Sequence, residues 1–160
     1  MTVQVSESPV DAQVVSHYIL WKREGKNTTN LDVIKLVYLS HGWHLGIYEA
    51  PLITEPVEAW PYGPVVPSVY ERFKSFGRNP IDIVVQDNSR FLSTQQRLLI
   101  DQTLITYKDF ESWALSAITH EQGTPWHQIM TKYGTGSIIP NGLIQEHYGS
   151  LYREYHARKQ

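Results

Sequence analysis

The chain contains no cysteine among its 160 residues. This absence excludes disulfide bonds, thiolate nucleophiles, iron–sulfur clusters and cysteine-ligated zinc. Long hydrophobic runs are missing too, since none approaches the roughly 20 residues that cross a bilayer. The opening residues, 1–9, carry neither the basic nor the apolar segment of a secretory signal. We therefore expect a cytoplasmic protein without a membrane partner.

An excess of basic charge is also absent. Fourteen Lys and Arg residues stand against sixteen Asp and Glu residues, which gives a net charge of −2. Proteins that bind nucleic acid through its phosphates are usually basic, so no nucleic-acid partner is expected. Two small basic groups, within 22–26 and 153–159, are interpreted as solvated helix ends because aromatic residues do not alternate with them.

The composition is that of a folded globular protein. Apolar residues make up 41% of the chain and charged residues 19%, and aromatic residues reach 12%, with five Trp and ten Tyr. A length of 160 residues favours a single domain spanning 1–160. So many rings require an aromatic core or an aromatic binding surface.

Hydrophobic residues recur at helical spacing along most of the chain. Ser8 and Pro9 resemble a helix N-cap and first position, Gly25 a stop, and Ser93 with Gln96 a capping box. Helices are predicted at about residues 9–25, 31–48, 69–76, 93–105, 109–118, 125–130 and 140–157. The helix that Asp109 opens has one apolar stripe, which we expect to face the core, formed by Phe110, Trp113, Ala114, Ala117 and Ile118.

The predicted helix 31–48 is apolar around nearly its whole circumference. Only a narrow strip of small or polar residues interrupts it: Asp32, Lys35, Gly42 and Gly46. A helix of this kind is buried, so we expect it to be the central helix of the domain. The two glycines, four residues apart, leave room for another backbone to approach closely.

Five prolines between positions 51 and 67 exclude a helix there. Residues 55–60 can form only a short edge strand, and residues 81–85 a second strand that pairs with it. The predicted fold class is mainly α: a compact helical domain around a buried central helix, with a small β-hairpin at most.

The search for catalytic residues finds no convincing site. His41 and His44 lie three apart on the central helix and could face one metal ion, but a pair of hydrogen-bonded core histidines is the favoured interpretation. His120 begins a zinc-protease pattern that Thr124 and Pro125 interrupt, so it is assigned to a helix C-terminus. Residues 134–137 are assigned to a loop rather than a phosphate cradle.

Neither a serine nucleophile elbow nor a pair of carboxylates can be recognised. We therefore predict that the protein is not an enzyme and needs no metal or other cofactor. The alternative, a metal-dependent hydrolase that uses His41, His44 and His120, stays open at this stage.

Several segments together resemble one known family. They are residues 35–45, with the sequence KLVYLSHGWHL; Pro51-Leu52; residues 58–70, with EAWPYGPVVPSVY; and residues 115–121 with Pro125-Trp126. These blocks, from about 30 to 126, are similar to the Panacea antitoxin domain, also called the SocA-like or phage-associated GepA-like family. The stretch around Tyr62-Gly63-Pro64 is the specific part of the match.

The resemblance implies a mostly helical domain that neutralises a toxin encoded beside it through direct protein–protein binding. The cognate toxins of the family are diverse, and some relatives act instead as adaptors that deliver a toxin to a protease. Members also occur in phages and prophages. Stand-alone antitoxin, protease adaptor and phage decoy are all compatible with the resemblance, and it implies no catalytic residue.

The same blocks contain the candidate partner-binding residues. Prolines 61–67 fix a turn in which Gly63 can adopt a positive φ angle, so nearby rings project from a rigid frame. These rings either fill the core beside the central helix or serve as interface anchors. The five candidates are Trp60, Tyr62, Tyr70, His120 and Trp126. The oligomeric state stays open.

Overall fold

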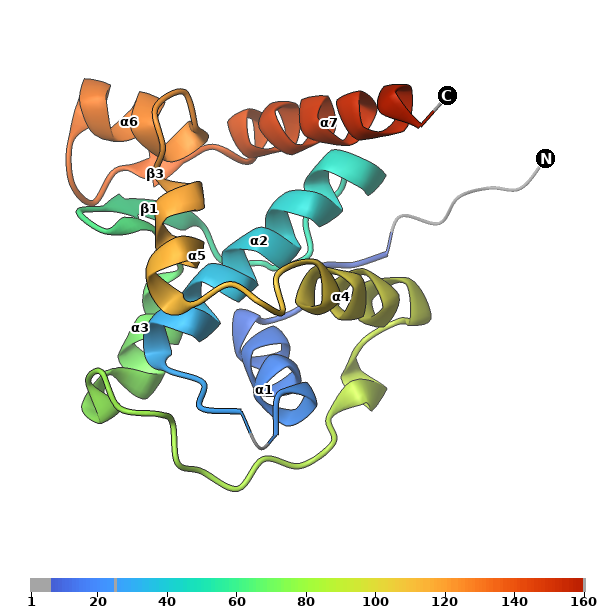
Figure 1. The fold of residues 1–160 in the computed structure, drawn as a ribbon, viewed down its shortest axis with the longest axis vertical. Coiled ribbons are helices and arrows are strands. Elements are labelled where there is room, and N and C mark those ends of the chain that lie inside the picture. The colour runs from blue at the N-terminus through green and yellow to red at the C-terminus, as the bar shows by residue number, and fades with distance from the viewer. Residues whose placement is uncertain (1–6, 25, 160) are drawn as a thin grey trace.

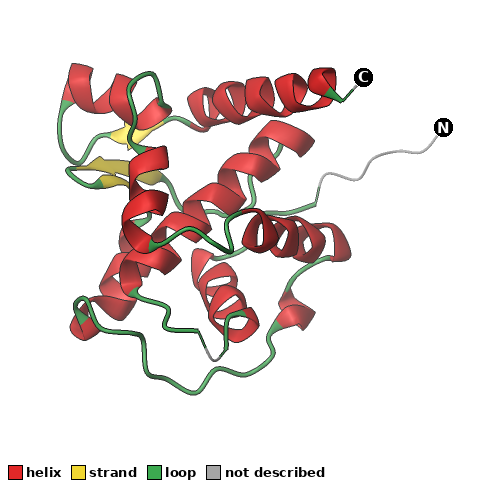
Figure 2. Ribbon diagram, in the orientation of Figure 1, coloured by secondary structure: helices red, strands yellow, loops and turns green. Residues whose placement is uncertain are grey.

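The computed structural model describes residues 7–24 and 26–159, and within them helices predominate (Figures 1 and 2). The helices are α1 (Ala12–Lys22), α2 (Asn30–Tyr48), α3 (Pro67–Phe73), α4 (Thr94–Thr106), α5 (Ser112–Thr119), α6 (Pro125–Tyr133) and α7 (Asn141–Arg158), with short 3₁₀ turns η1 (Lys74–Phe76) and η2 (Ser89–Phe91). The strands are β1 (Val57–Trp60), β2 (Gly63–Val65) and β3 (Ile138–Ile139). The prediction of a mainly α fold is confirmed.

Helix α2 is the central element. It starts at a reciprocal capping box between Thr29 and Asp32 and runs diagonally through the molecule (Figure 1). Helices α1, α3, α4, α5 and α7 and strand β2 all contact it. Most of its residues up to Leu45 are buried, including Asp32 and Lys35 on the polar strip. The prediction of a buried central helix is confirmed.

The two glycines of α2 lie under helix α7. A Cβ atom built on Gly46 would lie 2.6 Å from the backbone nitrogen of Gly149, and one on Gly42 would lie 2.6 Å from the ring of Tyr148. Real Cβ atoms do not come so close to their neighbours. The predicted close approach of a second backbone is therefore confirmed, and α7 is that second element.

The small sheet differs from the predicted pairing. Its order is β2-β1-β3, and both pairs are antiparallel, so β1 is the central strand and not an edge strand. Trp60 pairs with Gly63 across a two-residue turn, so β2, the next segment of the chain, is one neighbour of β1. The other edge of β1 pairs with β3, which follows the predicted loop 134–137.

The predicted strand at residues 81–85 is therefore wrong. This segment is irregular, and Ile81, Ile83, Val84 and Val85 lie beside the end of α1. The backbone nitrogen of Ile81 donates to the carbonyl of Thr28, so the segment is fastened to the α1–α2 connection. Ile81 and Val85 pack against the core, whereas Ile83 and Val84 are exposed, so the alternation marks a loop attached through two side chains.

Two helix starts also differ from the prediction. Helix α1 begins at Ala12, because Asp11 caps it and Val10 forms a parallel bridge with Ile53. It ends at Lys22, and Gly25, the predicted stop, lies outside the described residues. Helix α5 begins at Ser112 and not at position 109. The capping box of Ser93 and Gln96 at α4 is confirmed.

Candidate partner-binding surface

The five candidate residues gather at one end of the molecule, around the β1–β2 hairpin. Four of them are half-buried and pack in pairs, and we call Trp60, Tyr70, His120 and Trp126 the aromatic corner. The rings of Trp60 and Tyr70 are 5.0 Å apart, and those of His120 and Trp126 are 5.4 Å apart. The indole nitrogen of Trp126 donates to the Trp60 carbonyl at 2.6 Å, which joins the two pairs.

The aromatic corner lies partly in the core and partly at the surface. Trp60, Tyr70 and Trp126 pack against the hydrophobic core, and each keeps part of its ring accessible. Tyr62 differs from them, because its side chain at the tip of the turn is 78% exposed. As expected, Gly63 in this turn has a positive φ angle, of 113°.

Lys35, on the polar strip of α2, lies between this helix and the hairpin. Its side chain is fully buried, and its Nζ atom donates to the carbonyl of Pro64 at 3.0 Å. Burial lowers the pKa of this ammonium group from 10.5 to about 7. A Cβ atom on Gly63 would lie 2.7 Å from this nitrogen, and the φ angle of 113° favours glycine here as well. Lys35 therefore fastens the hairpin to α2.

Helix α5 is turned differently from its predicted orientation. Of its apolar stripe, only Ile118 packs against the hydrophobic core, and the buried residues are Leu115, Ser116 and Thr119. Trp113, on the predicted stripe, is 71% exposed. The rest of the stripe consists of residues that are only partly buried or exposed: Phe110, Ala114, Ala117 and Ile118.

Polar contacts explain this orientation of α5. The hydroxyl of Ser112 donates to the buried carboxylate of Asp32 at 2.6 Å, and the hydroxyl of Ser116 donates to the carbonyl of Tyr62 at 2.9 Å. Buried acceptors need such donors, so α5 presents its hydroxyl groups inward. Trp113 consequently faces outward, whereas Leu115 stays buried.

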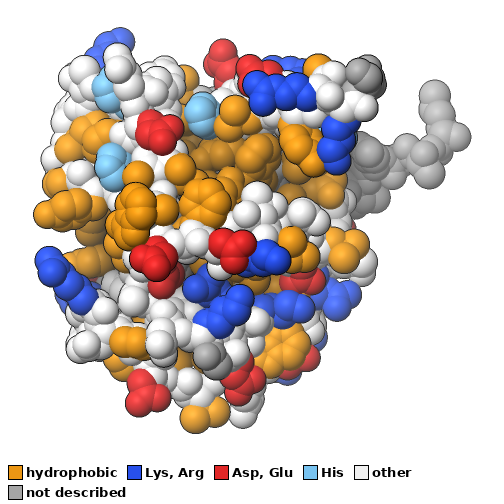
Figure 3. Space-filling model, viewed as in Figure 1, with side chains coloured by type: hydrophobic (Ala, Val, Ile, Leu, Met, Phe, Trp, Pro, Cys, Tyr) orange, Lys and Arg blue, Asp and Glu red, His pale blue; other side chains and the backbone are white. Residues whose placement is uncertain are grey.

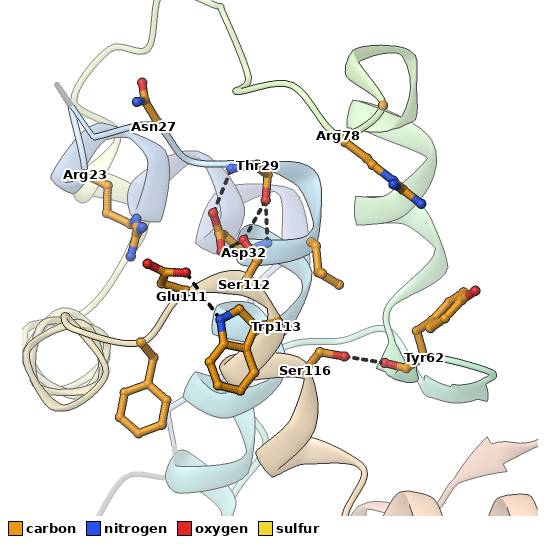
Figure 4. Close-up of a pocket in the computed structure, with 13 residues that line it drawn as sticks. Arg23, Asn27, Thr29, Asp32, Tyr62, Arg78, Glu111, Ser112, Trp113 and Ser116 are labelled. Carbon is orange, nitrogen blue, oxygen red and sulfur yellow. Dashed lines mark hydrogen bonds between the residues drawn. The ribbon is translucent and has the colours of Figure 1, made fainter.

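A groove of about 820 Å³ opens beside the exposed face of α5 (Figure 4). Trp113 lies in its middle, Tyr62 and Arg78 on one side, and Arg23 on the other. On the face shown in Figure 3, hydrophobic side chains gather over α5 and beside it. We call this the α5 groove, and it is lined by Arg23, Asn27, Thr29, Leu31, Asp32, Tyr62, Gly77, Arg78, Phe110, Glu111, Ser112, Trp113 and Ser116.

The histidines of α2 are core residues, as the favoured interpretation held. His41 Nε2 bonds Asn141 Oδ1 at 3.0 Å, and its Nδ1 lies 3.3 Å from the amide nitrogen of Leu52. Burial lowers the pKa of His41 to about 4. His44 Nδ1 bonds the Ala50 carbonyl at 2.6 Å. Both rings thus serve to hold α2 to the chain that follows it.

His120 caps the C-terminus of α5, as predicted, and its ring lies against Trp126. Across residues 7–24 and 26–159, no three His, Asp or Glu side chains come together as a possible metal site. In the same part of the chain, no helix is both long enough and apolar enough to cross a membrane.

Comparison with known proteins decides the family. The family described as Antitoxin SocA-like, Panacea domain, matches residues 33–127. The chain belongs to this Panacea family. Antitoxin SocA of Caulobacter vibrioides (strain NA1000 / CB15N) is 29% identical over 157 residues, which cover 87% of this chain and 82% of that protein. No solved structure matches the chain. These relationships support an antitoxin role.

The Panacea match covers most of the surface described above. It includes the hairpin, the aromatic corner, the residues of α5 and Arg78. Arg23 and the whole of α7 lie outside it. The part of the α5 groove around Trp113 and Tyr62 is thus built from the Panacea domain itself.

Proposed function

We propose that this Panacea protein is an antitoxin that neutralises a cognate protein toxin by binding to it directly. The family membership supports the antitoxin role. The observation that carries direct binding is the exposed aromatic surface formed by Trp113 and Tyr62, because large exposed rings in a concave site are typical of interfaces. Neutralisation then works by occlusion, and the toxin's active surface is covered.

A rigid surface favours such occlusion. The hairpin is held by Lys35, and α5 is held by Ser112 and Ser116 through hydrogen bonds to other elements. Little conformational freedom is lost when a surface of this kind binds a partner. The protein need not carry out chemistry to protect a cell, and we propose no catalytic role, no metal and no cofactor for it.

Two further points belong to this proposal. We propose that residues 1–160 act as one Panacea-like domain, since α7, beyond the matched range, packs on α2 at Gly46. We also propose that it acts in the cytoplasm, where its toxin would be made. The toxin itself is expected from the gene beside this one.

The test is a growth assay with the product of the neighbouring gene. That product is induced alone and then together with this protein. Toxicity alone with recovery on co-expression supports the proposal and identifies the partner. A toxic neighbour that is not rescued, or a harmless one, contradicts it.

The half-life of the partner separates occlusion from delivery to a protease. Occlusion leaves the half-life of the toxin unchanged or longer when this protein is expressed. A shorter half-life that depends on a cellular protease would show that the protein is a proteolytic adaptor instead.

A further inference from the structure

We propose that the α5 groove binds an acidic segment of the partner protein, with an apolar side chain of that segment packed on Trp113. This proposal rests on the proposed antitoxin function, because the acidic segment is taken to be part of the toxin. The chemistry of the occupant follows from three properties of the groove: its rings, its charges and its rigidity.

The rings provide the apolar contact. Trp113 is 71% exposed, Tyr62 78% and Phe110 36%, and all three line the same groove. Large apolar surfaces exposed together are unfavourable in water, and covering them is the main source of affinity at many interfaces. An apolar side chain of the partner fits between these rings.

Two arginines of the groove favour acidic residues next to that apolar side chain in the ligand. Arg23 and Arg78 lie on opposite sides of the groove (Figure 4). Within the described residues, neither guanidinium group lies within salt-bridge distance of a carboxylate. Arg23 donates from its Nε atom to the Thr28 hydroxyl at 2.9 Å, which leaves its two terminal nitrogens for a ligand. Arginine binds carboxylates with two parallel hydrogen bonds, so both residues can hold acidic groups.

The two acidic residues of the groove, Asp32 and Glu111, form no ion pair with these arginines within the described residues and are engaged by other donors. Asp32 is buried and accepts from the Thr29 amide at 2.9 Å and from Ser112. Glu111 accepts from the indole nitrogen of Trp113 at 3.3 Å. Both carboxylates therefore stabilise the groove itself, and Glu111 also orients Trp113.

The groove is formed before any partner arrives. Ser112 links the start of α5 to the start of α2, and Ser116 links α5 to the turn that carries Tyr62. The two rings that would contact the ligand, Trp113 and Tyr62, are thus attached to the same hydrogen-bonded frame. This arrangement favours a short extended segment that enters the groove without a large rearrangement of the protein.

The first test uses a peptide and does not require the toxin. The probe is a synthetic peptide, Asp-Asp-Leu-Phe-Asp-Asp, and its control has lysine in place of every aspartate. We expect the acidic peptide to shift the NMR signals of the Trp113 indole and of the Arg23 and Arg78 side chains in a saturable way. Absence of these shifts, or equal shifts with the basic peptide, would overturn the proposal.

The second test measures binding of the purified partner found by the growth assay. Trp113→Ala should raise the Kd about tenfold or more. Tyr155→Ala is the matched control, because Tyr155 is also exposed but lies outside the groove, on α7. It should leave the Kd unchanged. The melting temperature of each variant confirms that it folds.

The charge requirement has its own variants. Arg78→Gln should weaken binding of the partner and reduce the loss of affinity that rising NaCl causes, whereas Arg78→Lys should retain most of the binding. A Gln variant that keeps the affinity and salt dependence of the wild type would contradict an acidic ligand.

The outcomes distinguish this proposal from the proposed function. If the toxin is neutralised but the Trp113 and Arg78 variants bind as the wild type does, the groove proposal is wrong and the antitoxin function stands. If the acidic peptide binds the groove but no neighbour is neutralised, the reverse holds. If sedimentation shows a dimer that Trp113→Ala converts to a monomer, a second copy occupies the groove and the acidic ligand is rejected.

Discussion

Lys35 is a charged side chain placed where a charge is costly. Its ammonium group donates to one carbonyl, that of Pro64, in the interior of the protein. The hydrogen bond positions the hairpin, while the desolvation of the charge opposes folding. Lys35 therefore fixes the position of the hairpin and at the same time lowers the stability of the fold.

This balance predicts how stability depends on pH. The pKa of Lys35 is about 7 in the folded protein and 10.5 ordinarily, so the unfolded chain binds more protons between these values. The free energy of unfolding should rise as the pH increases from about 7 towards 10.5. Lys35→Met should remove most of this slope and stabilise the protein by about 1–3 kcal/mol at neutral pH. Urea unfolding at several pH values measures both effects.

Lys74 offers the control for this experiment, because it is an exposed lysine on the surface. Lys74→Met should retain the slope of the wild type. A Lys35→Met variant with the full slope would mean that Lys35 is not its source. The tyrosines buried in the core have pKa values raised above 10.0, so they lower stability only where unfolded tyrosines lose their proton, near the upper end of this range and beyond it.

At the level of elements, the contact of α2 with α7 depends on the absence of side chains. Gly46 and Gly149 bring the two backbones together, and Tyr148 packs over Gly42 and against Trp43 with ring centroids 5.1 Å apart. A side chain at the glycine contact meets backbone, which cannot rotate aside. Close packing of this kind is strict about size.

Gly46→Ala should therefore destabilise the protein by about 2–3 kcal/mol, although alanine favours helices. Gly142→Ala is the matched control. Gly142 lies in the first turn of α7, and a Cβ atom there would meet nothing within 4 Å. This substitution should be neutral or stabilise by up to about 1 kcal/mol. Equal effects of the two substitutions, measured by thermal and urea unfolding, would contradict the packing argument.

Helix α5 shows where reasoning from one sequence stops. Its helical spacing, its C-terminal residue and the neighbouring Pro125-Trp126 start are local signals, and they were predicted correctly. Which side faces inward depends on Asp32 and the Tyr62 carbonyl, acceptors supplied by distant parts of the chain. The apolar stripe alone indicated the opposite orientation, and so Trp113 was missed as a site residue.

The same distinction holds for the rest of the fold. The central helix, its two glycines and the capping box of α4 follow from short-range patterns and are confirmed. The pairing of β1 with β3 joins segments about 80 residues apart, and no local pattern encodes it. The five candidate residues lie close together because the β1–β2 turn, α3 and the adjacent ends of α5 and α6 carry them, and their role in binding stays a prediction.

For the molecule as a whole, buried histidines set the behaviour in acid. Burial lowers the pKa of His41 to about 4, and lowers the pKa of His44 and His147 as well. An unfolded histidine binds its proton near pH 6.5, so the unfolded state gains protons first as the solution is acidified. The folded protein is consequently stable above this pH and loses stability below it.

We expect the free energy of unfolding to fall as the pH decreases from about 6.5 to 4, with His41 contributing up to about 3 kcal/mol. His41→Gln should be less stable at neutral pH, because the bond to Asn141 is disturbed, but should show a shallower decline in acid. Chemical unfolding at pH 7 and at about pH 4.5, which lies between the ordinary and the folded pKa of His41, measures how much stability each protein loses in acid. A decline as steep as that of the wild type would assign the acid sensitivity to other groups.

The inward-facing hydroxyls of α5 have a consequence for how such a protein can change over generations. Ser112 and Ser116 bond the helix to other elements, whereas Trp113, Ala114 and Ala117 lie on its outer side. If the α5 groove binds the partner, fold and specificity are thus encoded by different residues of one helix. Substitutions on the outer side can alter partner choice without unfolding the scaffold, so a lineage could follow a changing toxin in small steps, each of which leaves a folded antitoxin.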